Sequence, residues 1–143
     1  MAVASTTATA GTNACRRLNW IVEADTASYF TTDGAFVDGV GVTVSAPGEK
    51  LEDISKRCFL SPVGILSTQL GGGTTRKYGT SMAAPHVAGI VARMYEGDVA
   101  VGVEYIRDML RANALAAAPG APIESPSSAY TDDGEQEGVA HVQ

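Results

Sequence analysis

The segment from Ser81 to Met94 constrains the fold more than any other part of the chain. Proline is tolerated only in the first turn of a helix, so Pro85 predicts a helix that begins between about Ser81 and Ala84. Apolar side chains then recur at helical spacing, at Val87, Ile90, Val91 and Met94. Small residues cover much of the remaining circumference, and no face is strongly polar before Arg93. We therefore expect this helix to be buried at the centre of a domain.

Several other segments have the pattern of strands or of a surface helix. The expected strands are Ala2–Thr6, Asn19–Ala24, Val40–Val44 and Gly64–Thr68, with a candidate last strand at Gly138–Val142. Pro47 and Gly48 predict a turn after the third of these. An amphipathic surface helix is expected from Val103 to Leu115, with Val103, Ile106 and Leu110 on one face. The sequence therefore predicts an α/β fold.

Three segments have the composition of loops. Glu49–Val63 is mixed and charged, which predicts a surface insertion, and three consecutive glycines at Gly71–Gly73 predict a flexible loop. Residues 119–143 combine a Pro/Ser-rich linker with a tail. The tail is acidic, because aspartates and glutamates occur in it and no lysine or arginine follows Arg111. The 143 residues fit one domain. We assign 1–118 to that domain and 119–143 to the linker and tail.

Composition excludes several classes of function. The formal net charge is −6, and the few basic pairs, such as Arg16–Arg17, cannot form a surface for nucleic acid. No apolar run is long enough to span a membrane, and the first residues lack the apolar region of a signal peptide. Histidines and cysteines are too few and too dispersed for a zinc site, and no acidic cluster matches a calcium loop. We expect no metal and no cofactor. Cys15 and Cys58 form one disulfide or remain two free thiols.

Ser81 is the candidate catalytic residue. At the N-terminus of a buried helix, a serine has unpaired amide hydrogens beside it and the positive end of the helix dipole behind it. Such an environment suits a nucleophile that forms an oxyanion. Serine also caps helices frequently, and the physical argument alone leaves both roles open.

A family resemblance bears on this choice. Gly79–Gly89, with the sequence GTSMAAPHVAG, resembles the nucleophile segment of the subtilisin-like serine proteases over its whole length. Gly41–Glu49 resembles the family's strand and Ala-Pro-Gly turn, and Tyr105–Ala114 resembles its following helix. The resemblance implies that Ser81 is the acyl-forming nucleophile and that its own amide is one oxyanion donor. It also implies a partial three-layer α/β/α fold with a mostly parallel sheet, of which we expect only the C-terminal half in this chain.

The resemblance does not supply the other catalytic groups. The family's order is Asp, His, Ser, but no histidine precedes Ser81. His86 lies five residues beyond Ser81, about 140° around the helix, so we interpret it as structural. His141 matches no family motif, and Asp25 lies in a segment where Ala27 replaces the expected glycine. Asn13 has a local likeness to the second oxyanion donor, but we interpret it as a loop residue.

The expected function is therefore that of a serine endopeptidase acting on peptides or proteins. We expect the chain to be a fragment whose partner, the N-terminal half of the catalytic domain, carries the Asp and His. Loss of the base costs on the order of 10⁶ in turnover, a value that comes from subtilisin itself, so the chain alone should be inactive. The alternative is a non-catalytic, degenerate protease half that serves as a binding or interaction module. The family implies an extracellular or cell-surface location.

Overall fold

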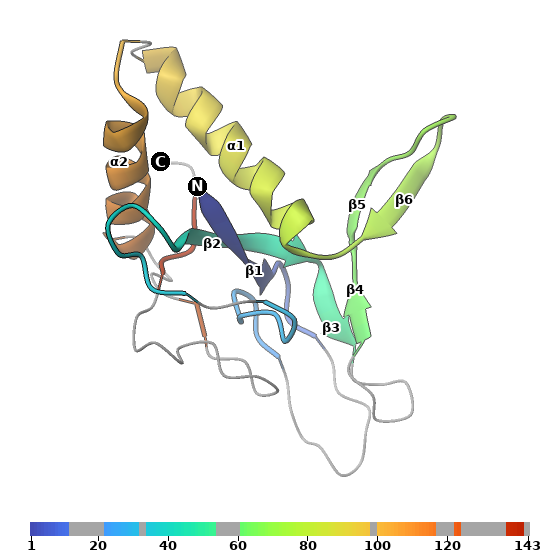
Figure 1. The fold of residues 1–143 in the computed structure, drawn as a ribbon. Coiled ribbons are helices and arrows are strands. Elements are labelled where there is room, and N and C mark those ends of the chain that lie inside the picture. The colour runs from blue at the N-terminus through green and yellow to red at the C-terminus, as the bar shows by residue number, and fades with distance from the viewer. Residues whose placement is uncertain are drawn as a thin grey trace.

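The computed structural model describes residues 1–11, 22–31, 34–53, 61–97, 100–116, 122–123 and 137–141. Its strands are β1 (Ala2–Thr7), β2 (Val42–Glu49), β3 (Leu51–Asp53), β4 (Ser61–Val63), β5 (Ile65–Thr68) and β6 (Thr74–Lys77). Its helices are α1 (Thr80–Gly97) and α2 (Val103–Ala116), as Figure 1 shows. None of the described helices is long and apolar enough to cross a membrane.

Strands β1 and β2 form the centre of the fold. They pair in parallel, with Ala4 opposite Ser45. On the other side of β2, the Ser45 amide donates to the Gly138 carbonyl at 2.9 Å, which places the segment around Val139 alongside in the same direction. The expected last strand is thus represented, in the described residues, by a single bridge at Val139.

Both helices pack against the β1–β2 pair. The core combines residues from β2, α1 and α2, namely Val44, Ala46, Ala83, Val87, Leu110 and Ala114. Both expected helices are found. Helix α2 starts at Val103 as expected, but α1 starts at Thr80, one residue before the expected range, so Pro85 lies beyond its first turn. In α2, Ile106 and Leu110 are buried as expected, whereas Val103 at the first position is 61% exposed.

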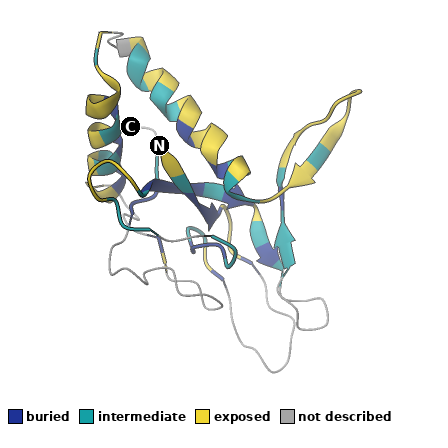
Figure 2. Ribbon diagram, in the orientation of Figure 1, coloured by how far each residue is buried: buried dark blue, intermediate teal, exposed yellow. Residues whose placement is uncertain are grey.

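The expectation that α1 is buried all round is wrong for the described structure. Ala83 and Val87 are buried, but Ser81, Pro85 and Ala88 are exposed, and Figure 2 shows much of the outer face of the helix exposed. The spacing of apolar residues identified the inward face correctly. Small residues on the opposite face permit burial without requiring it, and the described elements cover one side of the helix.

Two expectations about β2 and the segment after it are also wrong. Strand β2 continues through Pro47 and Gly48 to Glu49, because pairing with β1 extends that far and a strand tolerates proline where its amide is not needed. The expected insertion Glu49–Val63 contains an antiparallel pair, β3 with β4. Residues 54–60 of that insertion lie outside the described part.

Strands β5 and β6 form a hairpin that projects from the rest of the molecule (Figure 1). Its turn contains Gly71, Gly72 and Gly73, whose φ values of 87°, 96° and 81° are strongly disfavoured for residues with a side chain. The expected loop at these glycines is therefore a hairpin turn. The expected strand at Gly64–Thr68 is confirmed as β5, which starts at Ile65.

The fold class is confirmed as mixed α/β. The expected mostly parallel sheet is not found in the described residues, where β1–β2 is parallel and the other two strand pairs are antiparallel. From the expected strand Asn19–Ala24, residues 22–24 are described, and Val22 forms an isolated bridge with Gly11. The division between 1–118 and 119–143 stays a prediction.

Candidate active site

Ser81 is the second residue of α1 and is exposed to solvent. The helix is started by Gly79, whose carbonyl accepts hydrogen bonds from the amides of Met82 (2.8 Å) and Ala83 (3.3 Å). The Ser81 hydroxyl forms no hydrogen bond with any residue in the described part of the chain. It therefore makes no capping bond there, and the hydroxyl is available to a bound molecule.

Proline at position 85 changes the backbone beneath this serine. Because α1 begins at Thr80, Pro85 is the sixth helical residue and lies beyond the first turn. A proline has no amide hydrogen, so the carbonyl of Ser81 lacks its usual helical donor. The amide of Ser81, in the first turn, likewise has no acceptor within the helix. Both backbone polar groups of Ser81 are thus left without partners in the helix.

The start of α1 is held against the end of β2. The Gly79 amide donates to the Gly48 carbonyl at 3.0 Å. A side chain at Gly48 would overlap the Ser5 hydroxyl and come within 2.7 Å of the Gly79 carbonyl oxygen. Gly79 itself has a φ of 135°, which favours glycine. These two glycines permit the close contact that positions Ser81.

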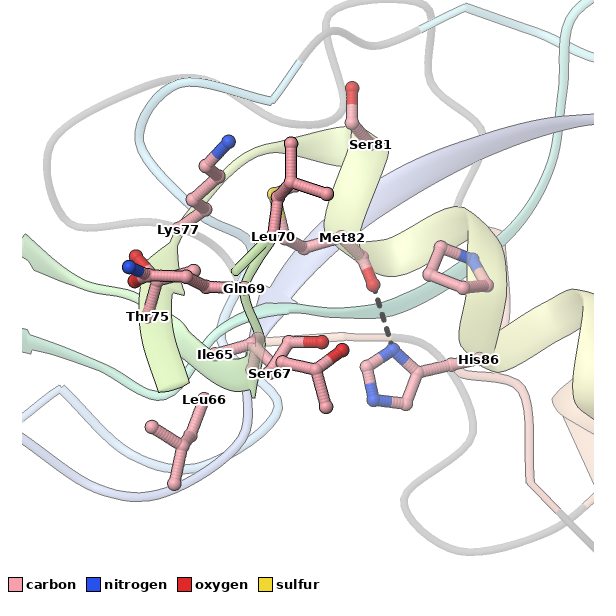
Figure 3. Close-up of a pocket in the computed structure, with 12 residues that line it drawn as sticks. Ile65, Leu66, Ser67, Gln69, Leu70, Thr75, Lys77, Ser81, Met82 and His86 are labelled. Carbon is pink, nitrogen blue, oxygen red and sulfur yellow. Dashed lines mark hydrogen bonds between the residues drawn. The ribbon is translucent and has the colours of Figure 1, made fainter. Parts of the chain in front are cut away.

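A cavity of about 710 Å³ lies beside Ser81, between α1 and the β5–β6 hairpin. Its lining comes from the hairpin and from the first turns of α1: Ile65, Leu66, Ser67, Thr68, Gln69, Leu70, Thr75, Lys77, Ser81, Met82, Pro85 and His86. Figure 3 shows Ser81 and Lys77 at the same side of this cavity. The cavity can receive a group of a molecule that is bound at Ser81.

His86 also lines the cavity but does not contact Ser81. Its Nδ1 lies 2.8 Å from the carbonyl oxygen of Met82, one turn earlier in the helix, as the dashed line in Figure 3 indicates. The ring therefore donates to its own helix. His141 is placed beside β2, with its Nδ1 3.4 Å from the Val139 carbonyl oxygen. Neither histidine forms a hydrogen bond with Ser81 in the described structure.

The remaining candidates are a turn residue and three residues outside the described part. Asp25 lies in a turn with a φ of 61°, and its amide donates to Thr7 at 2.9 Å. Burial raises the pKa of its carboxyl group. Asp25 is thus a turn residue that forms no hydrogen bond with Ser81 in the described structure. Asn13, Cys15 and Cys58 lie outside the described residues, and the disulfide stays a prediction.

Sequence reasoning missed two buried acids next to this region. Glu49 and Glu52 are fully buried, although both lie in the segment expected to be a surface insertion. Glu52 Oε1 accepts a hydrogen bond from the Tyr29 amide at 3.0 Å, whereas both oxygens of Glu49 lack a partner within hydrogen-bond distance. Burial raises the pKa of Glu49 to about 7; the nearby Ser28 hydroxyl lowers it and Glu52 raises it. No local pattern distinguishes such acids from solvated ones.

The described residues hold no group of three or more side chains that could bind a metal ion. Glu49 and Glu52 therefore do not form a metal-binding group with a third described side chain. The site thus combines the Ser81 hydroxyl, a helix N-terminus and an adjacent cavity lined by apolar and polar side chains.

The chain matches the model of the subtilase family over residues 1–143 and belongs to that family. No curated protein and no solved structure gave a significant match. Subtilases are serine proteases, which agrees with the resemblance in Gly79–Gly89. The expected family is confirmed.

Proposed function

We propose that this chain carries the nucleophile of a serine endopeptidase, and that the nucleophile is Ser81. The observation that carries the proposal is the exposed, unbonded hydroxyl at the N-terminus of α1, beside a cavity and within the family's nucleophile segment. In this function, Ser81 Oγ attacks a peptide carbonyl, the amine leaves, and water hydrolyses the acyl-enzyme. The Ser81 amide and the positive end of α1 stabilise the oxyanion.

A base must take the proton of Ser81 for this reaction to proceed. We propose that the Asp and His of the triad and the second oxyanion donor come from a segment outside these 143 residues. The hydrogen bond of His86 to its own helix and the position of His141 beside β2 support this. The exposed face of α1, with Ala84, Ala88 and Gly89, offers a smooth surface for that segment. Without it, the chain would be inactive.

A second candidate function is a non-catalytic binding module. The observation in its favour is that the Ser81 hydroxyl has no hydrogen-bond partner among the described residues and that both histidines bond elsewhere. The two functions differ in the coding sequence that each requires next to these residues. The first requires coding sequence for segments of the Asp-Thr-Gly and His-Gly-Thr type that can join this chain, and the second does not. We favour the first and propose an extracellular location, which is common in the family.

Labelling with a serine-directed fluorophosphonate probe tests the proposal. The protein is produced together with the coding sequence that adjoins these residues in its gene, as wild type and as Ser81→Ala. We expect the wild type to be labelled and to cleave a peptide amide, and Ser81→Ala to lose both properties. Equal labelling of both proteins would contradict the role of Ser81. If neither protein is labelled and the adjoining coding sequence contains no Asp or His segment of the triad, the binding module is favoured.

A further inference from the structure

Lys77 is the one formally charged side chain among the residues that line the cavity beside Ser81. The remaining lining groups are apolar or neutral polar, with Ile65, Leu66 and Leu70 contributed by the hairpin. Lys77 forms no ion pair or hydrogen bond through its ammonium group with the described residues. The cavity therefore presents an unpaired cation four residues before Ser81 in the sequence.

Lys77 and its neighbour Arg76 are adjacent on β6, but their charged groups have different surroundings. Lys77 pairs with Ile65 of β5, and its neighbour Arg76 pairs with Leu66. Successive side chains of a strand point to opposite faces. Arg76 uses its own face to donate from Nη1 to the Gly64 carbonyl at 2.9 Å, while Lys77 lines the cavity. Figure 3 shows the Lys77 ammonium group extending to the same side of the cavity as the Ser81 hydroxyl.

The backbone of Lys77 lies directly against Gly64, the residue before β5. A side chain at Gly64 would lie 2.6 Å from the backbone of Lys77, so the two segments are in close contact. The flexible stem of Lys77 lets its ammonium group reach a partner within the cavity. Because charges beyond about 8 Å are largely screened at physiological salt, this local cation outweighs the acidic charge of the protein as a whole for a group bound there.

We propose that Lys77 binds a carboxylate of the peptide substrate, so that this site prefers peptides with Asp or Glu close to the scissile bond. The inference rests on the proposed function of Ser81 and adds the substrate class. The ammonium group attracts the carboxylate, and the apolar hairpin residues contact the aliphatic part of the same peptide. A C-terminal carboxylate offers the same chemistry as an acidic side chain, and the experiment separates the two sources.

Peptide binding to the Ser81→Ala variant tests this inference without requiring catalysis. The probes are three fluorescein-labelled heptapeptides of equal sequence apart from the carboxylate: one with a central Glu and an amidated end, one with Gln and an amidated end, and one with Gln and a free C-terminus. Fluorescence anisotropy at about 0.15 M salt, where the net acidic charge is screened, gives the affinities. Because an exposed ion pair contributes modestly, we expect the Glu peptide to bind roughly two- to five-fold more tightly than the amidated Gln peptide. High salt should remove the difference.

Substitutions in the same Ser81→Ala background identify the cation. Lys77→Met should abolish the preference for the Glu peptide, and Lys77→Glu should reverse it. Arg93→Met is the matched control, since it removes one positive charge from the exposed part of α1 outside the cavity lining and should keep the preference. Circular dichroism checks that each variant is folded.

The peptide-binding results test the inference about Lys77 independently of the proposed role of Ser81. A preference for the free C-terminus that is lost in Lys77→Met would support the carboxylate contact and assign it to the end of the peptide. Equal affinity for all three peptides, absence of binding, or a preference that survives Lys77→Met would overturn the inference. None of these results depends on whether Ser81 reacts with fluorophosphonate. Failure of that labelling would contradict the proposed function alone.

Discussion

The carbonyl oxygen of Gly48 accepts a hydrogen bond from the amide of Gly79 at 3.0 Å, and this bond joins the end of β2 to the start of the helix that carries Ser81. Gly48 lies one residue before the end of its strand, and Gly79 lies directly before α1. The parallel pair at the centre of the fold thus determines where the candidate nucleophile is held.

Substitution of Gly48 should disturb this junction. In Gly48→Ala the new side chain overlaps the Ser5 hydroxyl and lies 2.7 Å from the Gly79 carbonyl oxygen. Relief of such an overlap requires backbone movement, and we expect a loss of about 1–3 kcal/mol in the free energy of unfolding. Urea denaturation measures the loss. Gly89→Ala is the control, since no atom lies within 4 Å of the added group on α1. It should stabilise the protein by about 0.5–1 kcal/mol.

The burial of Glu49 should make stability depend on pH. Its pKa is raised from 4.5 to about 7, so the folded protein binds the proton more tightly than the unfolded chain does. The stabilising contribution of the protonated carboxyl is complete below about pH 4.5 and is lost as the pH rises towards 7. Relative to wild type, Glu49→Gln should therefore gain stability from pH 4.5 to 7.5, by up to roughly 3 kcal/mol.

Urea denaturation of both proteins at the two pH values measures this gain. Glu96→Gln, at an exposed position of α1, is the control and should differ from wild type by the same amount at both pH values. A difference between wild type and Glu49→Gln that does not change with pH would show that the buried carboxyl does not titrate in this range.

Two leucines of α2 allow a matched comparison of core and surface. Leu110 is 1% exposed and belongs to the core shared by β2, α1 and α2, whereas Leu115 is 52% exposed. Leu110→Ala should cost about 2–5 kcal/mol in the free energy of unfolding, because it leaves a cavity among packed residues. Leu115→Ala should change it by less than about 0.5 kcal/mol. Similar losses in both variants would mean that α2 does not pack as described.

Arg111 links α2 to the start of β2 and to Phe36, which precedes that strand. Its guanidinium lies 4.2 Å from the centre of the Phe36 ring, and its Nη1 donates to the carbonyls of Val42 (3.2 Å) and Thr43 (3.3 Å). Lysine cannot reproduce a planar group that stacks and donates at once. We expect Arg111→Lys to lower the free energy of unfolding by about 1–2 kcal/mol. Arg93→Lys, at an exposed position, should be neutral, and thermal denaturation compares the two.

The sequence predicted the elements whose pattern is local. The spacing of apolar residues in α1 and α2 identified both helices and their inward faces, and the run Ala2–Thr6 identified β1. The end of β2 was not predictable in the same way, because pairing with β1 decides that Pro47 and Gly48 remain in a strand. That pairing joins residues about 40 positions apart in the chain and leaves no local signal.

The candidate site was also predicted only in part, because some of its features are local in the sequence and others depend on long-range packing. Ser81 was identified from a motif in which it occupies a fixed place. The burial of Glu49 and Glu52 depends on what packs above them, which neither acid reveals in its neighbours. The exposure of one face of α1 likewise depends on whether another element covers it. Lys77 joins the cavity because β5 and β6 form a hairpin beside α1, which became evident only from the structure.

The β5–β6 hairpin forms one wall of the cavity but is not part of the central strand pair. Its strands pair with each other and, within the described residues, with no other strand. An isolated two-stranded hairpin is marginally stable, so this arm can bend or fray at much lower free energy than the β1–β2 centre. Widening the cavity for a bulky peptide therefore requires movement of one arm and leaves the packing beneath Ser81 intact. If the proposed function holds, tolerance of substrate size and rigidity of the candidate nucleophile are properties of separate parts of the chain.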